Sequence, residues 1–193
     1  MVSLGLYFRL KLLLENDQEN YRHYWNILGD PLKLESAVAL SRTAPPVGVQ
    51  PYHVLLMARR LGLQVHNSEE HDLAWIAYLA LTVKLPTSTE TNLMITSPRN
   101  STRYQKVCNM KPGEHPGDKY FRTVLVYNQL RRRILLEHMT PEDQTKYIKS
   151  QSWVKLKEES GSMYYHNFMT KQKTINLPSD QKDIVSRTAA LTL

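Results

Sequence analysis

The sequence has a single cysteine, Cys108, and only seven glycines among its 193 residues. One cysteine cannot form an internal disulfide and leaves no cysteine cluster for structural zinc, which fits a reducing compartment. The few glycines form no glycine-rich phosphate loop, which argues against nucleotide hydrolysis. None of the seven histidines pairs with another at the spacing of a helical metal site. We therefore expect a protein without catalytic residues, a metal site or a cofactor.

The sequence also lacks an apolar run long enough to cross a membrane. Its apolar opening, Met1 to Leu14, is interrupted by Arg9 and Lys11 and has no small-residue cleavage pattern, so no secretory signal is expected. A mitochondrial presequence is an alternative because the stretch is basic, although acidic residues follow closely. With 41% hydrophobic and 22% charged residues, the composition is that of a globular protein that can bury a core.

The net charge of +7 is concentrated in one segment. Between Arg99 and Arg133 nine basic residues stand against two acidic ones, and this excess of seven equals that of the whole chain. Such a concentration predicts attraction to a polyanion, either nucleic acid or an acidic protein surface such as that of tubulin. The alternative is a solvated basic face without a partner. The nine residues are Arg99, Arg103, Lys106, Lys111, Lys119, Arg122, Arg131, Arg132 and Arg133.

Apolar residues at helical spacing predict that most of the chain before residue 150 is helical. Asp30-Pro31 and Thr140-Pro141 are typical helix starts, and Gly62 is a typical helix end. The proline-rich stretch 43–51 predicts a linker, and the polar stretch after Leu85-Pro86 predicts loops or weak strands. The expected helices are 1–28 (one or two helices), 31–41, 52–60, 67–84, 118–138 and 140–149.

Two of these helices have specific expected features. In 67–84, Asn67 and Glu70 predict a capping box, and the acidic residues there are explained by the helix dipole. Its expected buried stripe is Leu73, Ile76, Ala77, Ala80 and Leu81, with Trp75 at the flank. In 118–138 we expect the cations to stay in water. The side chains expected to be buried are Phe121, Val124, Leu125, Leu130, Ile134 and Leu135.

Three short antiparallel strands are predicted near the C-terminus, at 154–157, 163–168 and 174–176. A sheet this small must close its two ends on each other around large side chains, and Trp153 and Pro178 stand at those ends. By alternation, Tyr165 shares their face and Tyr164 points to the opposite one. Asn167 is expected to tie the second strand to the following turn through its side-chain amide.

The spacing of Trp153, Gly161, Tyr164-Tyr165, Asn167, Thr170, Thr174 and Pro178 resembles that of a WW domain over residues 152–179. WW domains bind proline-rich peptides in the polyproline II conformation. Here Ile175 stands in place of the second tryptophan and Phe168 in place of a frequent histidine, so the resemblance implies a docking element with a weakened peptide groove. It implies a core of Trp153, Tyr165, Asn167 and Pro178, and a peptide- or partner-binding face of Tyr164, His166, Phe168, Thr170 and Ile175.

A second resemblance lies upstream of this module. The sequence Ala58-Arg-Arg-Leu-Gly-Leu followed by Glu70-His-Asp-Leu-Ala-Trp75-Ile-Ala is similar to the helical preface of WW modules in centriolar distal-appendage and other ciliary proteins. Leu85-Pro86, His115-Pro116 and the run Asp118 to Arg122 follow in that family's order. The resemblance implies a degenerate first WW-like unit over 86–116, which keeps Tyr104 but has no first tryptophan.

We therefore predict an α+β, mostly α fold with a helical N-terminal half, a long basic helix and a small C-terminal three-stranded antiparallel WW-like sheet. The predicted parts are a helical segment and linker (1–50), a helical domain with the degenerate unit and the basic helix (51–139), a short helix with the WW-like domain (140–180) and a tail (181–193).

The expected function is that of a non-catalytic structural protein that docks partners within a large intracellular assembly. The resemblance favours a ciliary, axonemal or basal-body location in the cytoskeleton, with tubulin or axonemal subunits as partners and no membrane. One alternative is an accessory subunit of a ribonucleoprotein, such as the mitochondrial ribosome, that contacts RNA through Arg99 to Arg133. Another is a soluble adaptor for proline-rich peptides.

Overall fold

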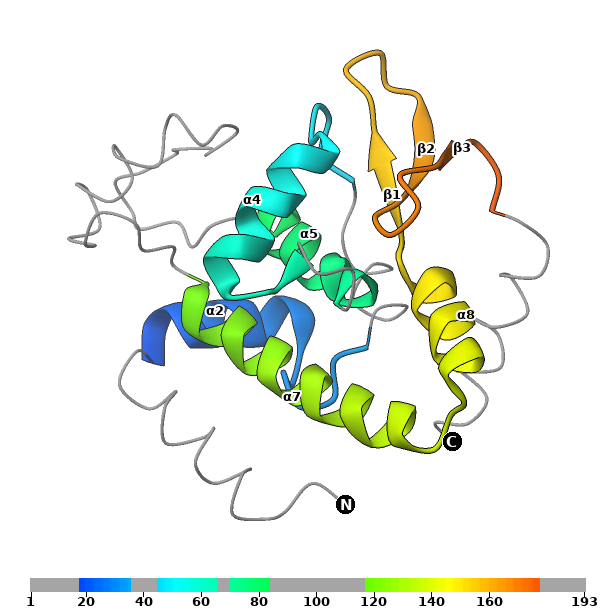
Figure 1. Ribbon diagram of the computed structural model, residues 1–193. Coiled ribbons are helices and arrows are strands. Elements are labelled where there is room, and N and C mark those ends of the chain that lie inside the picture. Colours follow the sequence, from blue (N-terminus) through cyan, green and yellow to red (C-terminus); the bar gives the residue numbers. More distant parts are fainter. Residues whose placement is uncertain (1–17, 36–44, 66–69, 84–116, 178–193) are drawn as a thin grey trace.

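The computed structural model describes residues 18–35, 45–65, 70–83 and 117–177. Figure 1 shows a body of helices with a small sheet beside it, reached through the last helix. The predicted class, α+β and mostly α with a C-terminal three-stranded antiparallel sheet, is confirmed. The elements are α2 (Gln18–Leu28), α4 (Pro51–Leu61), the 3-10 helix η3 (His71–Leu73), α5 (Ala74–Thr82), α7 (Asp118–Glu137), α8 (Pro141–Gln151), β1 (Trp153–Lys157), β2 (Met163–Asn167) and β3 (Lys173–Thr174).

The centre of the molecule is α5, which is buried on every side. All residues from Ala74 to Ala80 are buried, so the predicted flank residue Trp75 lies in the core with the expected stripe, of which only Leu81 is half-buried. The helix begins later than predicted because His71 to Leu73 form a 3-10 turn. A short helix that is apolar all round needs cover on all sides, and α4, α7 and β1 contact it.

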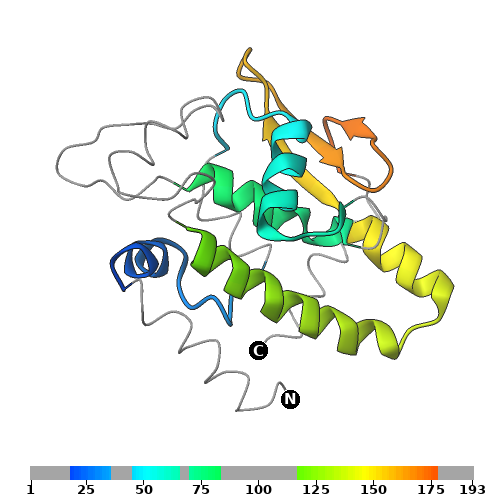
Figure 2. The same ribbon diagram turned by 60° about the vertical axis from the view of Figure 1, so that its left-hand side comes forward.

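The outer helix α4 follows the prediction closely. It has Pro51 at its first turn, and it ends at Gly62, whose φ of 95° is the left-handed conformation that glycine adopts without strain. Its buried residues, Val54, Met57, Ala58 and Leu61, face α5. Figure 2 shows α4 on the outer side of the molecule.

The predicted helix over 31–41 is wrong for the residues that the structure describes there. Residues 31–35 form a turn and an irregular stretch. The Asp30 side chain accepts a hydrogen bond from the Leu32 N–H at 3.0 Å, and the Asp30 carbonyl accepts one from the Lys33 N–H at 3.0 Å. An aspartate that bonds the backbone two residues on stabilises a turn in competition with a helix. Residues 36–41 lie outside the described ranges.

The long helix α7 has nearly its predicted bounds, but only its first half is in the core. Tyr120, Phe121, Val124 and Leu125 are buried, and the Phe121 ring packs edge-on against Tyr24 of α2 at 5.2 Å. Leu130 is half-buried, and Ile134 and Leu135 are exposed, contrary to prediction. The reason is geometric, because the C-terminal end of α7 reaches past α5 to the point where α8 turns back (Figure 2).

The three strands pair in the order β1-β2-β3, with Leu156 opposite Tyr164 and Lys155 opposite Tyr165. Val154, Leu156 and Tyr164 share one face of the sheet and are buried, and β1 contacts α5. The buried side chains of the helices and of the sheet form one continuous cluster that runs from Tyr24 to Phe168. The predicted boundaries at 50/51 and 139/140 therefore do not separate independent cores.

The stretch predicted as a linker supports the sheet where the structure describes it. Val47 forms an isolated parallel bridge with Lys157, and the Gly48 N–H donates to the Lys157 carbonyl at 3.1 Å. This contact occupies one end of the outer edge of β1. Pro45 and Pro46 precede it and have no N–H to continue a ladder.

Asn167 has the role predicted for it, and one more. Its Oδ1 accepts from the N–H groups of Met169 and Thr170 at 3.0 and 2.8 Å, which fixes the turn after β2. Its Nδ2 also donates to the carbonyl of Lys149 at 2.9 Å, so the same buried amide holds the last turn of α8. Asn167 thereby joins α8 to the sheet.

We expect Asn167→Ala to lower the free energy of unfolding by about 2–4 kcal/mol, because three partly buried backbone groups lose their partner. Asn167→Asp keeps the two acceptor bonds but sets a buried carboxylate oxygen against the Lys149 carbonyl, so its cost should fall as the pH is lowered and the carboxyl is protonated. Urea unfolding followed by circular dichroism measures both. A cost of Asn167→Asp that does not change with pH would show that the buried charge contributes nothing.

Candidate docking surface

The residues predicted as a peptide-binding face do not lie together on an open surface. Tyr164 is 6% exposed, and it lies with Phe168 in the core shared with the helices. Ile175, in contrast, is 77% exposed. His166 is half-buried against the Phe168 ring, and burial, aided by the positive Lys173, lowers its pKa. Thr170 is also half-buried.

This arrangement corrects the expectation that the Tyr164 side of the sheet faces a ligand. Alternation did place Tyr164 and Tyr165 on opposite faces, as predicted. However, large side chains on the Tyr164 face gain more from burial against α5 than from exposure to water. Lys173 lies at the edge of this face. Its Nζ is 4.3 Å from the centre of the Tyr164 ring and forms an ion pair with Glu158.

The predicted WW core residues occupy the other face. Trp153, Tyr165 and Asn167 share it through the strand register, as expected. Trp153 and Tyr165 are half-buried, and the Lys155 Nζ lies 5.8 Å from the centre of the Tyr165 ring. Pro178 lies outside the described residues, and so does the predicted degenerate unit at 86–116.

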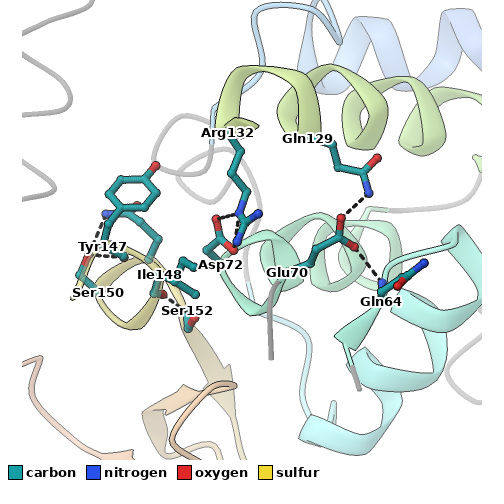
Figure 3. Close-up of polar contacts among 10 residues, drawn as sticks. Gln64, Glu70, Asp72, Gln129, Arg132, Tyr147, Ile148, Ser150 and Ser152 are labelled. Atoms are coloured by element: carbon teal, nitrogen blue, oxygen red, sulfur yellow. Dashed lines mark hydrogen bonds and ion pairs between the residues drawn. The ribbon is translucent and has the colours of Figure 1, made fainter. Parts of the chain in front are cut away.

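A buried ion pair connects α7 to η3. The Arg132 Nε donates to both Asp72 carboxylate oxygens, at 3.0 and 2.7 Å, and the side chains are 15% and 3% exposed (Figure 3). Burial raises the pKa of Asp72 above its ordinary value, although Arg132 acts in the opposite direction. Burial also raises the pKa of the nearby Tyr147 phenol in α8, and the Asp72 carboxylate adds to this effect. Arg132 is therefore an internal residue, contrary to the prediction that it stays in water.

Glu70 forms a second polar connection beside this pair. Its Oε2 accepts from the Gln64 N–H at 2.8 Å and its Oε1 from the Gln129 Nε2 at 2.7 Å (Figure 3). The acidic residues at 70 and 72 thus do more than complement a helix dipole. They fix α7 against the segment that leads into α5. Asn67, the other half of the predicted capping box, and Glu69 lie outside the described residues.

The structure describes five of the nine residues of the predicted basic surface, and of these five only Arg132 is internal. Arg131 pairs with Glu35 at 2.8 Å and Arg122 with Asp118 at 3.8 Å, while both remain partly exposed. Arg133 and Lys119 are exposed. Among the residues that the structure describes, Arg133 has no ion pair. The other members, Arg99, Arg103, Lys106 and Lys111, lie outside the described ranges.

The outward side of α7 carries cations and apolar residues together. Six residues follow each other at spacings of three and four along the helix and so lie on one side. We call them the α7 stripe: Lys119, Arg122, Val126, Leu130, Arg133 and Glu137. Beside its C-terminal half, from Val126 to Glu137, runs a groove of about 690 Å³, whose other walls include Glu70 and Gln144 of α8.

The groove is lined by apolar and polar side chains together. Its apolar residues, Val126, Leu130 and Leu136, lie beside charged and amide side chains. Within the described ranges, no group of three or more His, Cys, Asp or Glu side chains is placed to hold a metal ion. None of the helices in those ranges is both long and apolar enough to span a membrane. Comparison with known proteins found no matching family model, curated protein or solved structure.

Proposed function

We propose that this chain is a non-catalytic docking subunit of a large intracellular assembly and that it binds its partner through the α7 stripe. The observation that carries the proposal is the exposed Arg133, which has no ion pair among the described residues and lies beside Val126 and Leu130 at the groove. The sheet, in this proposal, braces the helices, because its Tyr164 face is buried against them.

The composition of the α7 stripe favours an acidic protein surface as the partner. Val126 is exposed between Arg122 and Arg133, and an apolar side chain there gains from a protein partner but little from a phosphate backbone. An RNA partner remains the second candidate because of the basic segment as a whole.

For the cellular setting we propose a cilium, an axoneme or a basal body, with tubulin as an acidic partner of the required kind. The support is the resemblance of the segments 58–63 and 70–77 to the helical preface of ciliary WW modules. Imaging of the tagged protein in ciliated cells and purification with its neighbours test this proposal. Recovery with tubulin or axonemal subunits supports it, and recovery with ribosomal RNA and ribosomal proteins contradicts it.

We expect Arg133→Glu to weaken binding to polymerised tubulin by roughly tenfold or more, since a cation at the partner's acidic surface becomes a repelling anion. Cosedimentation at several salt concentrations measures the loss. Lys155→Glu is the matched control, because it makes the same charge change on the exposed outer face of the sheet. If both variants lose binding equally, or if single-stranded RNA binds more tightly than tubulin, the stripe is not a specific protein surface.

A further inference from the structure

The helix α4 is apolar on both of its sides. Its inner side supplies core residues to the molecule. Its outer side exposes Tyr52 by 56%, Leu55 by 37% and Leu56 by 51%. A surface helix normally presents polar residues to water, so an apolar outer side indicates that another molecule covers it. Together with the exposed Arg59, these residues form the outer stripe of α4: Tyr52, Leu55, Leu56 and Arg59.

The outer stripe of α4 is complementary to itself in one orientation. Tyr52 lies three residues before the Leu55-Leu56 pair and Arg59 lies three residues after it. When two such helices run antiparallel, the leucines of both copies meet at the twofold axis. Each Tyr52 ring then faces the guanidinium of Arg59 from the other copy. An arginine over a tyrosine ring is a favourable contact, and this pairing forms it at both ends.

We propose that α4 pairs antiparallel with α4 of a second copy of this chain, so that the docking subunit forms a twofold-symmetric dimer. A parallel pairing lacks this match, because it sets Arg59 against Arg59. Twofold dimers of this isologous kind are the commonest oligomers.

The size of the outer stripe sets the expected strength of this dimer. An 11-residue helix is about 16 Å long, so two outer stripes bury less than the roughly 1,000 Å² typical of a stable interface. The dimer is therefore weak and concentration-dependent. Binding of both copies to one assembly would raise their effective concentration.

Cysteine cross-linking tests the orientation directly in a Cys108→Ser background. Opposed residues on packed helices are within reach of a short thiol cross-linker, since the helix axes are about 8–10 Å apart. A mixture of Tyr52→Cys and Arg59→Cys proteins should give cross-linked dimers, whereas each protein alone should not. Leu56→Cys, near the axis, should link to itself. Self-linking of Tyr52→Cys and of Arg59→Cys, or no linking in the mixture up to about 1 mM, overturns the proposal.

Charge variants provide a second, independent measurement by sedimentation analysis. Tyr52→Glu should keep the dimer, because the new carboxylate faces Arg59 of the other copy, and this dimer should weaken with salt. Tyr52→Lys and Arg59→Glu should each abolish it, and the two combined should restore it. Loss of the dimer in Tyr52→Glu, or no rescue in the combination, contradicts the antiparallel pairing. Arg133→Glu should leave the dimer unchanged, so this proposal and the proposed function fail separately.

Discussion

Arg132→Met is expected to lower the free energy of unfolding by about 3–5 kcal/mol, because the Asp72 carboxylate stays buried without its counter-charge. The Arg132–Asp72 ion pair is mostly buried and has two hydrogen bonds. Methionine has a similar length and keeps the packing of the side-chain stem. The predicted loss therefore reports mainly on the isolated charge.

The loss should depend on pH in a defined direction. Burial already raises the pKa of Asp72 above its ordinary value of 3.8, and without Arg132 the pKa rises further. A raised folded-state pKa means that the folded protein favours the protonated carboxyl. The resulting contribution to stability is fully present below the unfolded-state pKa, and it is lost as the pH rises through the folded-state pKa. The difference between the variant and the wild type should thus be smaller at about pH 4.5 than at about pH 7.5.

Urea unfolding at the two pH values measures this difference, and two further variants serve as controls. Arg131→Met removes an ion pair to Glu35 at the surface and should change stability by about 0–1 kcal/mol. Arg132→Met combined with Asp72→Asn removes both charges and should recover part of the loss. A pH-independent effect of Arg132→Met would rule out an isolated carboxylate as its cause.

Leu156→Ala is the second large prediction. Leu156 is fully buried and lies on the face of β1 that packs against the helices, and its truncation should cost about 2–5 kcal/mol. Because the sheet and the helices share one core, the whole described core should unfold in one transition at a lower urea concentration. Far-ultraviolet circular dichroism follows the helices, and tryptophan fluorescence follows the surroundings of Trp25, Trp75 and Trp153 together.

Ile175→Ala is the matched control, because Ile175 is highly exposed although it follows the same sheet. It should change stability by no more than about 0.5 kcal/mol. Two separate transitions in Leu156→Ala, with the helices melting at their wild-type midpoint, would instead indicate an independent sheet domain, as the sequence suggested.

The local structure could largely be predicted from sequence, because its signals are local. Thr140-Pro141 starts α8 with the Thr140 hydroxyl accepting from the Asp143 N–H, and Gly62 ends α4. The alternation in β2 correctly separated Tyr164 from Tyr165. These features depend on residues that are close in the chain, where propensity and periodicity act.

The tertiary arrangement could not be predicted in this way. No spacing rule connects Arg132 with Asp72, which is 60 residues away, so the sequence predicts this cation in water. The same holds for Tyr164, because local alternation alone predicts an exposed face for this side chain and carries no information on the helices that cover it. The outward leucines of α4 were visible in the sequence, but only the structure distinguishes its inner from its outer side.

The order of the elements also affects how the protein is made. The central helix α5 is apolar on every side, and one of its neighbours is β1, which is translated about 70 residues later. Until β1 and β2 emerge from the ribosome, Val154, Leu156 and Phe168 cannot cover the apolar surface of the helices, and this surface faces water. A nascent chain in this state is a substrate for chaperones, and shortened products that stop before β2 should aggregate.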